Sequence, residues 1–209
     1  MKFKHLLMAL VVSAFFFSCE EKRQSILVLG DGLSKNETML NLLSNRHSSY
    51  RWYSGGQDGA VVGDAARSLA SFIGNKGMEF QNVILWVGIQ DVWSDIPTQD
   101  TISGFLLIKD ICRKHHKNLI VLTIPIYCKN TSSGHREKID QIFELNSFIR
   151  ANFKEVDVNG TYVWLRDDTT VDGLAMNDNG ASSMSSYISL IVFEKNPHTI
   201  DLEPIKSDS

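Results

Sequence analysis

The chain has 209 residues, enough for one domain with a substantial hydrophobic core. Acidic residues (24) slightly outnumber Lys and Arg (21), the net charge is −3, and the sequence contains no basic run. This balance argues against nucleic acid as a partner, because phosphate backbones select strongly basic surfaces.

The N-terminus has the features of a secretory signal. Lys2 and Lys4 precede an apolar stretch over 6–17, and the small residue Ser18 follows. The stretch is too short to cross a bilayer, which takes about 20 residues. A buried N-terminal helix is the alternative, but such a helix normally shows one apolar stripe, and this stretch is apolar all round. We therefore expect residues 1–18 to be a signal peptide.

Ser18 is followed by Cys19, an arrangement that resembles the lipobox of bacterial lipoproteins, although Phe16 stands where that motif usually has Leu. The resemblance implies that the Cys19 thiol carries a diacylglycerol, whose two acyl chains suffice for stable anchoring. The expected location is the bacterial cell envelope, exported and attached to a membrane through this lipid. Simple cleavage and release is the alternative. Losing residues 1–18 removes two lysines and no acid, so the net charge becomes −5.

The rest of the mature chain divides into a short tether over 19–24, a domain over 25–194 and a polar tail over 195–209. Cys112 lies in an expected helix and Cys128 just after an expected strand. Two buried or half-buried thiols are the simpler interpretation, and a disulfide between them stays open because the chain is exported. No Cys or His spacing resembles a metal site, and no cofactor is expected.

Strands alternate with helices along this domain. The expected strands, in chain order, are Ser25–Leu29, Tyr50–Tyr53, Asn82–Val87, Asn118–Ile124 and Thr161–Leu165. The expected helices are Lys35–Arg46, Asp64–Gly74, Thr101–His116, Arg136–Phe153 and Asp178–Phe193. This alternation predicts a flavodoxin-like three-layer α/β/α sandwich with five parallel strands in the order 2-1-3-4-5. Ligands of such folds bind beyond the carboxyl ends of the strands.

The segments that follow the strands resemble, in order, the sequence blocks of the SGNH (GDSL-type) ester hydrolases. The resemblance covers nearly all of the mature chain. The matching segments are Gly30-Asp31-Gly32-Leu33-Ser34, Gly63 at the start of a helix, Gly88-Ile89-Gln90-Asp91, Glu144-Leu145-Asn146, and Asp172-Gly173-Leu174-Ala175 followed by Asn177 and Gly180.

The resemblance also shows which reacting groups are missing. In the family a Ser attacks the ester carbonyl, a His accepts its proton and an Asp orients the His. Here Gly32 stands at the Ser position and Ala175 at the His position, while Asp172 is kept. Of the oxyanion-hole donors, Gly63 is kept, but Gln90 replaces the usual Asn and is one methylene longer. Loss of a triad member lowers the rate by roughly a millionfold.

Three residues are conceivable substitutes for the missing groups. Ser34 lies two positions after Gly32, but with Glu37 it predicts a capping box at a helix start. His135 and His198 are expected in exposed loops.

Trp93 either packs in the core or stands at the mouth of the pocket, where it can stack on a sugar or acyl group.

We therefore expect a membrane-anchored protein of this fold without the family's catalytic chemistry, whose cleft binds an ester- or acetyl-bearing ligand such as a glycan or an acylated small molecule. The expected ligand-binding residues are Asp31, Gly32, Gly63, Gln90, Asp91, Trp93 and Asp172. One alternative is a divergent active ester hydrolase that uses other residues. Another is a structural or interaction protein whose cleft has collapsed, with bulky side chains above Gly32.

Overall fold

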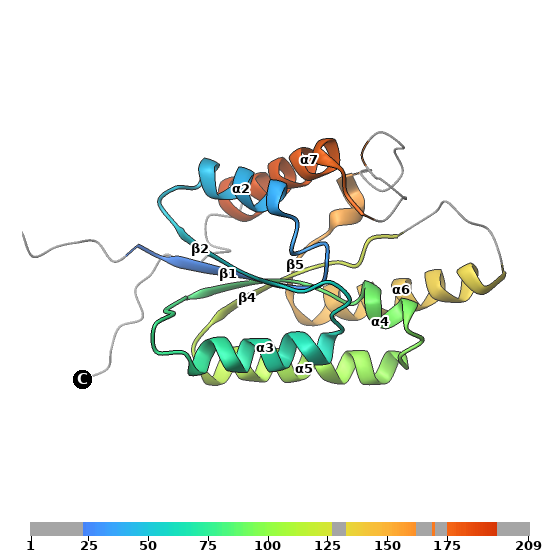
Figure 1. Ribbon diagram of the computed structural model, residues 1–209. Helices are drawn as coiled ribbons and strands as arrows, with labels where there is room; N and C mark the ends of the chain where they lie inside the picture. The colour runs from blue at the N-terminus through green and yellow to red at the C-terminus, as the bar shows by residue number, and fades with distance from the viewer. Residues whose placement is uncertain (1–22, 127–132, 162–168, 170–174, 196–209) are drawn as a thin grey trace, which may run out of the picture.

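The structure is a computed structural model that describes residues 23–126, 133–161, 169 and 175–195. Its centre is a five-stranded parallel sheet in the order β2-β1-β3-β4-β5, which confirms the predicted order (Figure 1). The strands are β1 (Ser25–Gly30), β2 (Arg51–Gly56), β3 (Asn82–Trp86), β4 (Asn118–Leu122) and β5 (Lys154–Val156).

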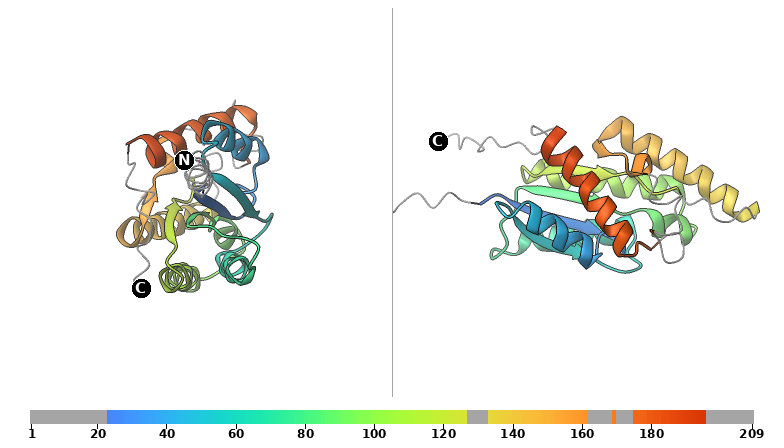
Figure 2. Two further views of the ribbon diagram at one scale, coloured as in Figure 1. Left: turned by 90° about the vertical axis from the view of Figure 1, so that its left-hand side faces the viewer. Right: turned by 90° about the horizontal axis from the view of Figure 1, so that it is seen from above.

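Helices cover both faces of the sheet, so the predicted three-layer sandwich is confirmed. Seen along the strands, α2 and α7 lie above the sheet and α3 and α5 below it (Figure 2). The helices are α2 (Glu37–Arg46), α3 (Val62–Gly74), α4 (Ile89–Trp93), α5 (Thr98–Lys114), α6 (Ser133–Asn152) and α7 (Asp178–Ile188). A 3₁₀ turn, η1 (Val158–Thr161), follows β5, and a π-helical segment, η3 (Ser189–Lys195), continues α7.

The central strands are buried on both faces because helices cover each side. Every residue of β1 and β3 is buried, which explains why their sequences, SILVLG and NVILW, are nearly continuous apolar runs. Trp86 is 1 % exposed, as expected for a core residue. In the described part of the chain, no helix is long and apolar enough to cross a membrane.

Four local predictions were wrong. His135, expected in an exposed loop, belongs to the helix Ser133–Asn152. The fifth strand is Lys154–Val156 and not 161–165; Thr161 belongs to η1, and 162–165 lie outside the described residues. The segment after β3, expected to be a loop, forms the one-turn helix α4. The N-cap of α2 is Asn36, whose side-chain oxygen accepts a bond from the Met39 N–H (2.9 Å), and not Ser34.

A close backbone approach ends β1. Gly30 has a φ of +146°, and a Cβ at this position would lie 1.8 Å from the carbonyl oxygen of Trp86 on β3. Only glycine fits such a conformation. The chain can therefore turn sharply at the end of β1 and place the next residues over the carboxyl edge of the sheet.

Candidate functional site

The turn after β1 is closed by bonds to the Asp31 carbonyl. That oxygen accepts the Lys35 N–H (3.1 Å) and the Ser34 hydroxyl (2.7 Å). Ser34 is fully buried. Its hydroxyl therefore braces the turn, and this position counts against Ser34 as a replacement nucleophile.

The Asp31 carboxyl group is buried beneath this turn, 2 % exposed. Oδ1 accepts the Leu33 N–H (3.0 Å), and Oδ2 has no partner among the described residues. Burial raises the pKa of Asp31 to about 7, against the lowering effect of the Leu33 hydrogen bond, and the charge of Asp91 raises it further. Near neutral pH this group can hold or release a proton.

Asp91 is also 2 % exposed and joins three elements at this edge. From α4 its carboxylate accepts the N–H of Val62 (3.0 Å to Oδ2) and the hydroxyl of Thr101 on α5 (3.3 Å). Burial raises the pKa of Asp91 to about 6, although these two bonds oppose the shift. Because Val62 directly precedes Gly63, this bond helps to hold the position that matches the family's oxyanion-hole glycine.

Gly32 is exposed, and its surroundings are open. Among the described residues, a Cβ built there would meet only the carboxylate of Asp58, at 3.1 Å. Asp58 forms an exposed ion pair with Lys35 (2.5 Å). The collapsed-cleft hypothesis expects bulky side chains here, and the described residues provide none.

Gly63 and Gln90, which match the family's oxyanion-hole positions in sequence, differ in how they are held. Gly63 lies in the first turn of α3, and a Cβ there would approach only Arg67, at 3.8 Å, which itself pairs with Asp64. The Gln90 amide donates to the Ser94 hydroxyl (2.9 Å), one turn further along the chain. The side-chain N–H of Gln90 is therefore bonded within its own helical segment.

Trp93 packs against the protein. It is half-buried against the core, and the ammonium of Lys138 on α6 lies 5.3 Å from its ring centre. Lys138 also donates to the carbonyl of Val92 (2.8 Å) and to Asp95 (2.7 Å). These contacts favour the packing interpretation of Trp93 over the stacking one.

The last sequence block is anchored on its C-terminal side. Ala175 is exposed, so no described side chain covers the position of the family's general base. Asn177 caps α7 by accepting the Gly180 N–H (3.0 Å), and its own N–H donates to the Thr169 carbonyl (3.1 Å). A Cβ on Gly180 would lie 2.1 Å from that carbonyl, which requires glycine there.

Several predicted residues lie outside what the structure describes. They are Cys19, Cys128, Asp172, His198 and the side chain of His135. Cys112 is buried in α5, and burial raises its pKa to about 12. Among the described residues, no three His, Cys, Asp or Glu side chains are arranged to hold a metal ion.

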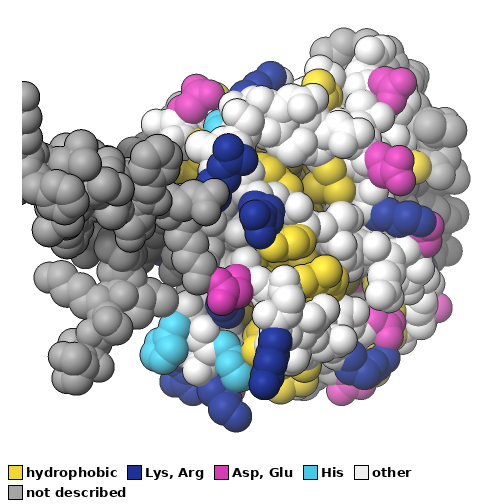
Figure 3. All heavy atoms as spheres, turned by 60° about the vertical axis from the view of Figure 1, so that its left-hand side comes forward, with side chains coloured by type: hydrophobic (Ala, Val, Ile, Leu, Met, Phe, Trp, Pro, Cys, Tyr) yellow, Lys and Arg dark blue, Asp and Glu magenta, His cyan; other side chains and the backbone are white. Residues whose placement is uncertain are grey.

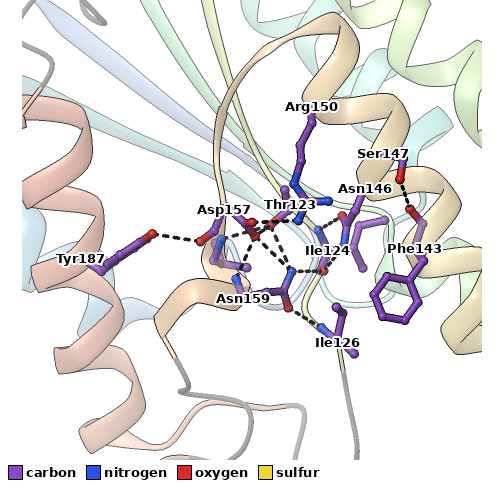
Figure 4. Close-up of polar contacts among 11 residues, drawn as sticks. Thr123, Ile124, Ile126, Phe143, Asn146, Ser147, Arg150, Asp157, Asn159 and Tyr187 are labelled. Carbon is purple, nitrogen blue, oxygen red and sulfur yellow. Dashed lines mark hydrogen bonds and ion pairs between the residues drawn. The ribbon is translucent and has the colours of Figure 1, made fainter.

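A polar network beyond β4 and β5 completes this edge (Figure 4). Asn146, part of the matched Glu-Leu-Asn segment, bonds both backbone groups of Ile124, at 2.7 and 2.8 Å. The Thr123 hydroxyl donates to Asp157 (3.0 Å), and the Asn159 amide donates to the Ile124 carbonyl (3.0 Å). Thr123, Asp157 and Asn159 were not predicted as site residues. A Thr at the end of an apolar strand was the available signal.

Comparison with solved structures identifies the fold. Over 82% of this chain and 99% of the other, it superposes on a member of the lipolytic G-D-S-L family from Veillonella parvula, with a TM-score of 0.68 and 12% identity. An acetyl xylan esterase, AlAXEase, gives a TM-score of 0.67 at 14% identity over 80% and 99% of the two chains. A lipase/acylhydrolase from Enterococcus faecalis gives 0.63 at 16% identity over 81% and 95%.

No family model and no curated protein matches the sequence. The fold is that of the SGNH (GDSL-type) hydrolases, as the order of the sequence blocks predicts. At these identities the likeness establishes the fold and leaves the activity to be inferred from the site.

Proposed function

We propose that this protein is a non-catalytic, lipid-anchored binding protein that uses the SGNH cleft for an ester- or acetyl-bearing ligand such as a glycan. The observation that carries the proposal is the combination at the carboxyl edge. The nucleophile and base positions are the exposed residues Gly32 and Ala175. The Asp91 carboxylate nevertheless holds the backbone just before Gly63, because it accepts the Val62 N–H.

Such a site holds a carbonyl group without attacking it. A backbone N–H at the start of α3 is a hydrogen-bond donor for a carbonyl oxygen, and no hydroxyl stands at position 32. An acetylated sugar supplies both the carbonyl and hydroxyl groups for polar contacts. The structural neighbour described as an acetyl xylan esterase supports the choice of an acetylated glycan as the ligand class.

The test compares the natural chain from Glu20 to Ser209, which retains every described element, with the double variant Gly32→Ser, Ala175→His. We expect acetylated oligosaccharides to bind the natural protein without turnover, and the double variant to hydrolyse acetyl esters. The added Ser Cβ lies 3.1 Å from a flexible, exposed Asp58, which can move. Deacetylated oligosaccharides are the matched control ligands.

Hydrolysis by the natural protein would overturn the proposal and favour a divergent hydrolase. Ser34→Ala then tests one candidate nucleophile, because activity that persists in this variant would exclude Ser34, whose hydroxyl braces the turn after β1. The lipid anchor is tested separately in the full chain. Labelling with radioactive palmitate should depend on Cys19 and disappear in Cys19→Ser.

A further inference from the structure

The two edges of the sheet differ in charge. Exposed basic residues gather at the amino edge, where the strands begin, and include Arg23, Arg51, Lys76, Arg113, Lys114 and Lys154. Only Glu79, Glu155 and Glu194 oppose them in the described segments of this edge, with Asp110 paired to Arg113 one turn back. The segments after β1, β2 and β3 at the carboxyl edge carry Asp31, Asp58, Asp64, Asp91, Asp95 and Asp100. Of these, Asp58, Asp64 and Asp95 are paired with Lys35, Arg67 and Lys138.

Strand register makes the amino edge one continuous surface. Ser25 pairs with Arg51, and Asn82 pairs with both Ile26 and Asn118, so the first residues of four strands lie side by side. Figure 3 shows this end of the molecule, where Lys, Arg and His side chains lie around an area in which apolar side chains reach the surface.

A hollow of about 410 Å³ opens at this edge, between the segments that enter β3 and β4. Its charged lining is Lys76, Lys117 and Glu79, beside His115, and its apolar lining is Ile73, Met78 and Phe80. The Lys117 ammonium is fixed, because it donates to the Phe80 carbonyl (2.6 Å) and lies 4.9 Å from the Phe80 ring centre. Cations above an apolar floor match the interface of a bilayer, where phosphates lie above the first methylenes.

The chain also enters the domain at this edge. Arg23 is four residues after Cys19, and four extended residues span at most about 14 Å. A lipid on Cys19, as proposed above, would therefore keep the amino edge close to the membrane surface. The mature chain carries a net charge of −5, so an anionic bilayer repels it as a whole and attracts it only through this edge.

We propose that the amino edge is a membrane-docking surface that contacts the headgroups of anionic phospholipids. Each Lys or Arg near such a surface contributes about 1 kcal/mol, and the attraction falls off within a Debye length. Docking in this way directs the carboxyl edge, with Gly32 and Asp91, away from the bilayer. This proposal goes beyond ligand binding at that edge and gives the anchored domain an orientation.

The experiment measures co-sedimentation of the unlipidated chain from Glu20 to Ser209 with phosphatidylcholine vesicles, with and without phosphatidylglycerol. We expect binding only to the anionic vesicles, weakening as salt is added. The triple variant Lys76→Gln, Lys114→Gln, Lys154→Gln should lower the affinity roughly a hundredfold. The control triple variant Lys35→Gln, Arg67→Gln, Arg136→Gln has the same net charge, changes the other edge and should bind like the natural chain.

Equal binding to pure phosphatidylcholine vesicles, or equal loss in the two triple variants, would overturn the proposal. All six substituted side chains are exposed, so the variants are expected to fold, and circular dichroism verifies this. Because the assay uses an unlipidated chain, it fails or succeeds independently of the palmitate-labelling and ligand-binding tests above.

Discussion

Two halves of the carboxyl edge hold acid groups at different depths, and the pKa values of these groups shift in opposite directions. Beyond β1, the Asp31 carboxyl has one backbone donor and a raised pKa. Beyond β5, burial also favours a higher pKa for Asp157, but hydrogen bonds from Arg150 (2.8 Å) and Thr123 (3.0 Å) outweigh it, so the pKa is lowered. Asp31 is 2 % exposed and forms no ion pair with a described residue, whereas the Asp157 side chain is 40 % exposed and paired with Arg150, so depth and partners together decide whether a carboxyl can exchange a proton near neutral pH.

This difference divides the edge by role. The Thr123–Asn159 side is a rigid support, in which the hydrogen bonds are satisfied within the protein (Figure 4). On the Asp31–Asp91 side, the Asp31 Oδ2 atom accepts no hydrogen bond from the described residues, and it lies next to exposed Gly32 in the chain. A binding site needs both properties, because a ligand can use only the polar groups that the fold has not already paired.

The largest expected effect comes from removing the support. Asn146→Ala leaves the N–H and C=O of Ile124 without their side-chain partner in a fully buried position, so we expect the unfolding free energy to fall by about 4 kcal/mol. Urea denaturation measures the loss. The neighbouring exposed residue offers a control, and Ser147→Ala should change little. A small effect of Asn146→Ala would mean that the two halves do not differ in rigidity.

Replacing Asp31 sharpens the comparison through pH. Its folded pKa is about 7 against 3.8 normally, so the folded state binds the extra proton and unfolding free energy falls as pH rises from about 4 to 7. Asp31→Asn keeps the oxygen that accepts from Leu33 and cannot ionise. It should stabilise the protein by roughly 4 kcal/mol at pH 8 and hardly at all at pH 3. Thermal melts across this range provide the measurement, and a gain that is equal at both pH values would contradict the burial account.

A smaller change is expected at Asp91. Thr101→Val preserves the shape of the side chain and removes its hydroxyl donor, so the unfolding free energy should drop by about 1 kcal/mol and the pKa of Asp91 should rise further. Carbon-detected NMR of the carboxyl group follows the titration. An unchanged pKa would show that the Val62 N–H alone sets the charge of Asp91.

The smallest effect on stability belongs to the ion pair beside Gly32. Asp58→Ala removes an exposed partner of Lys35, and we expect no measurable change in melting temperature. The same substitution opens the space over position 32, so it should raise the acetyl-esterase rate of the Gly32→Ser, Ala175→His variant. A clear loss of stability would show that the pair holds the cleft in shape.

Sequence patterns located the central strands, and they also located Asp31 and Asp91, because each of these acids follows a continuous apolar run. The same approach failed for β5, whose three residues include exposed Lys154 and Glu155 and therefore carry no apolar signal. It misassigned the cap of α2, since Ser34 and Asn36 are both good capping types and only the fold shows that the Ser34 hydroxyl bonds to Asp31. The Gln90–Ser94 bond depends on a one-turn helix too short to show periodicity.

The length of the parallel strands also sets the distance between the amino edge and the carboxyl edge of the sheet. The six residues of β1 rise about 20 Å from the amino edge to Gly30. With the amino edge resting on a bilayer, Asp31 stands more than two Debye lengths above the headgroups at about 0.15 M salt. The surface potential of the membrane is screened at that height, so Asp31 and Asp91 should titrate with the pH of the bulk solution, whatever the lipid composition beneath the domain.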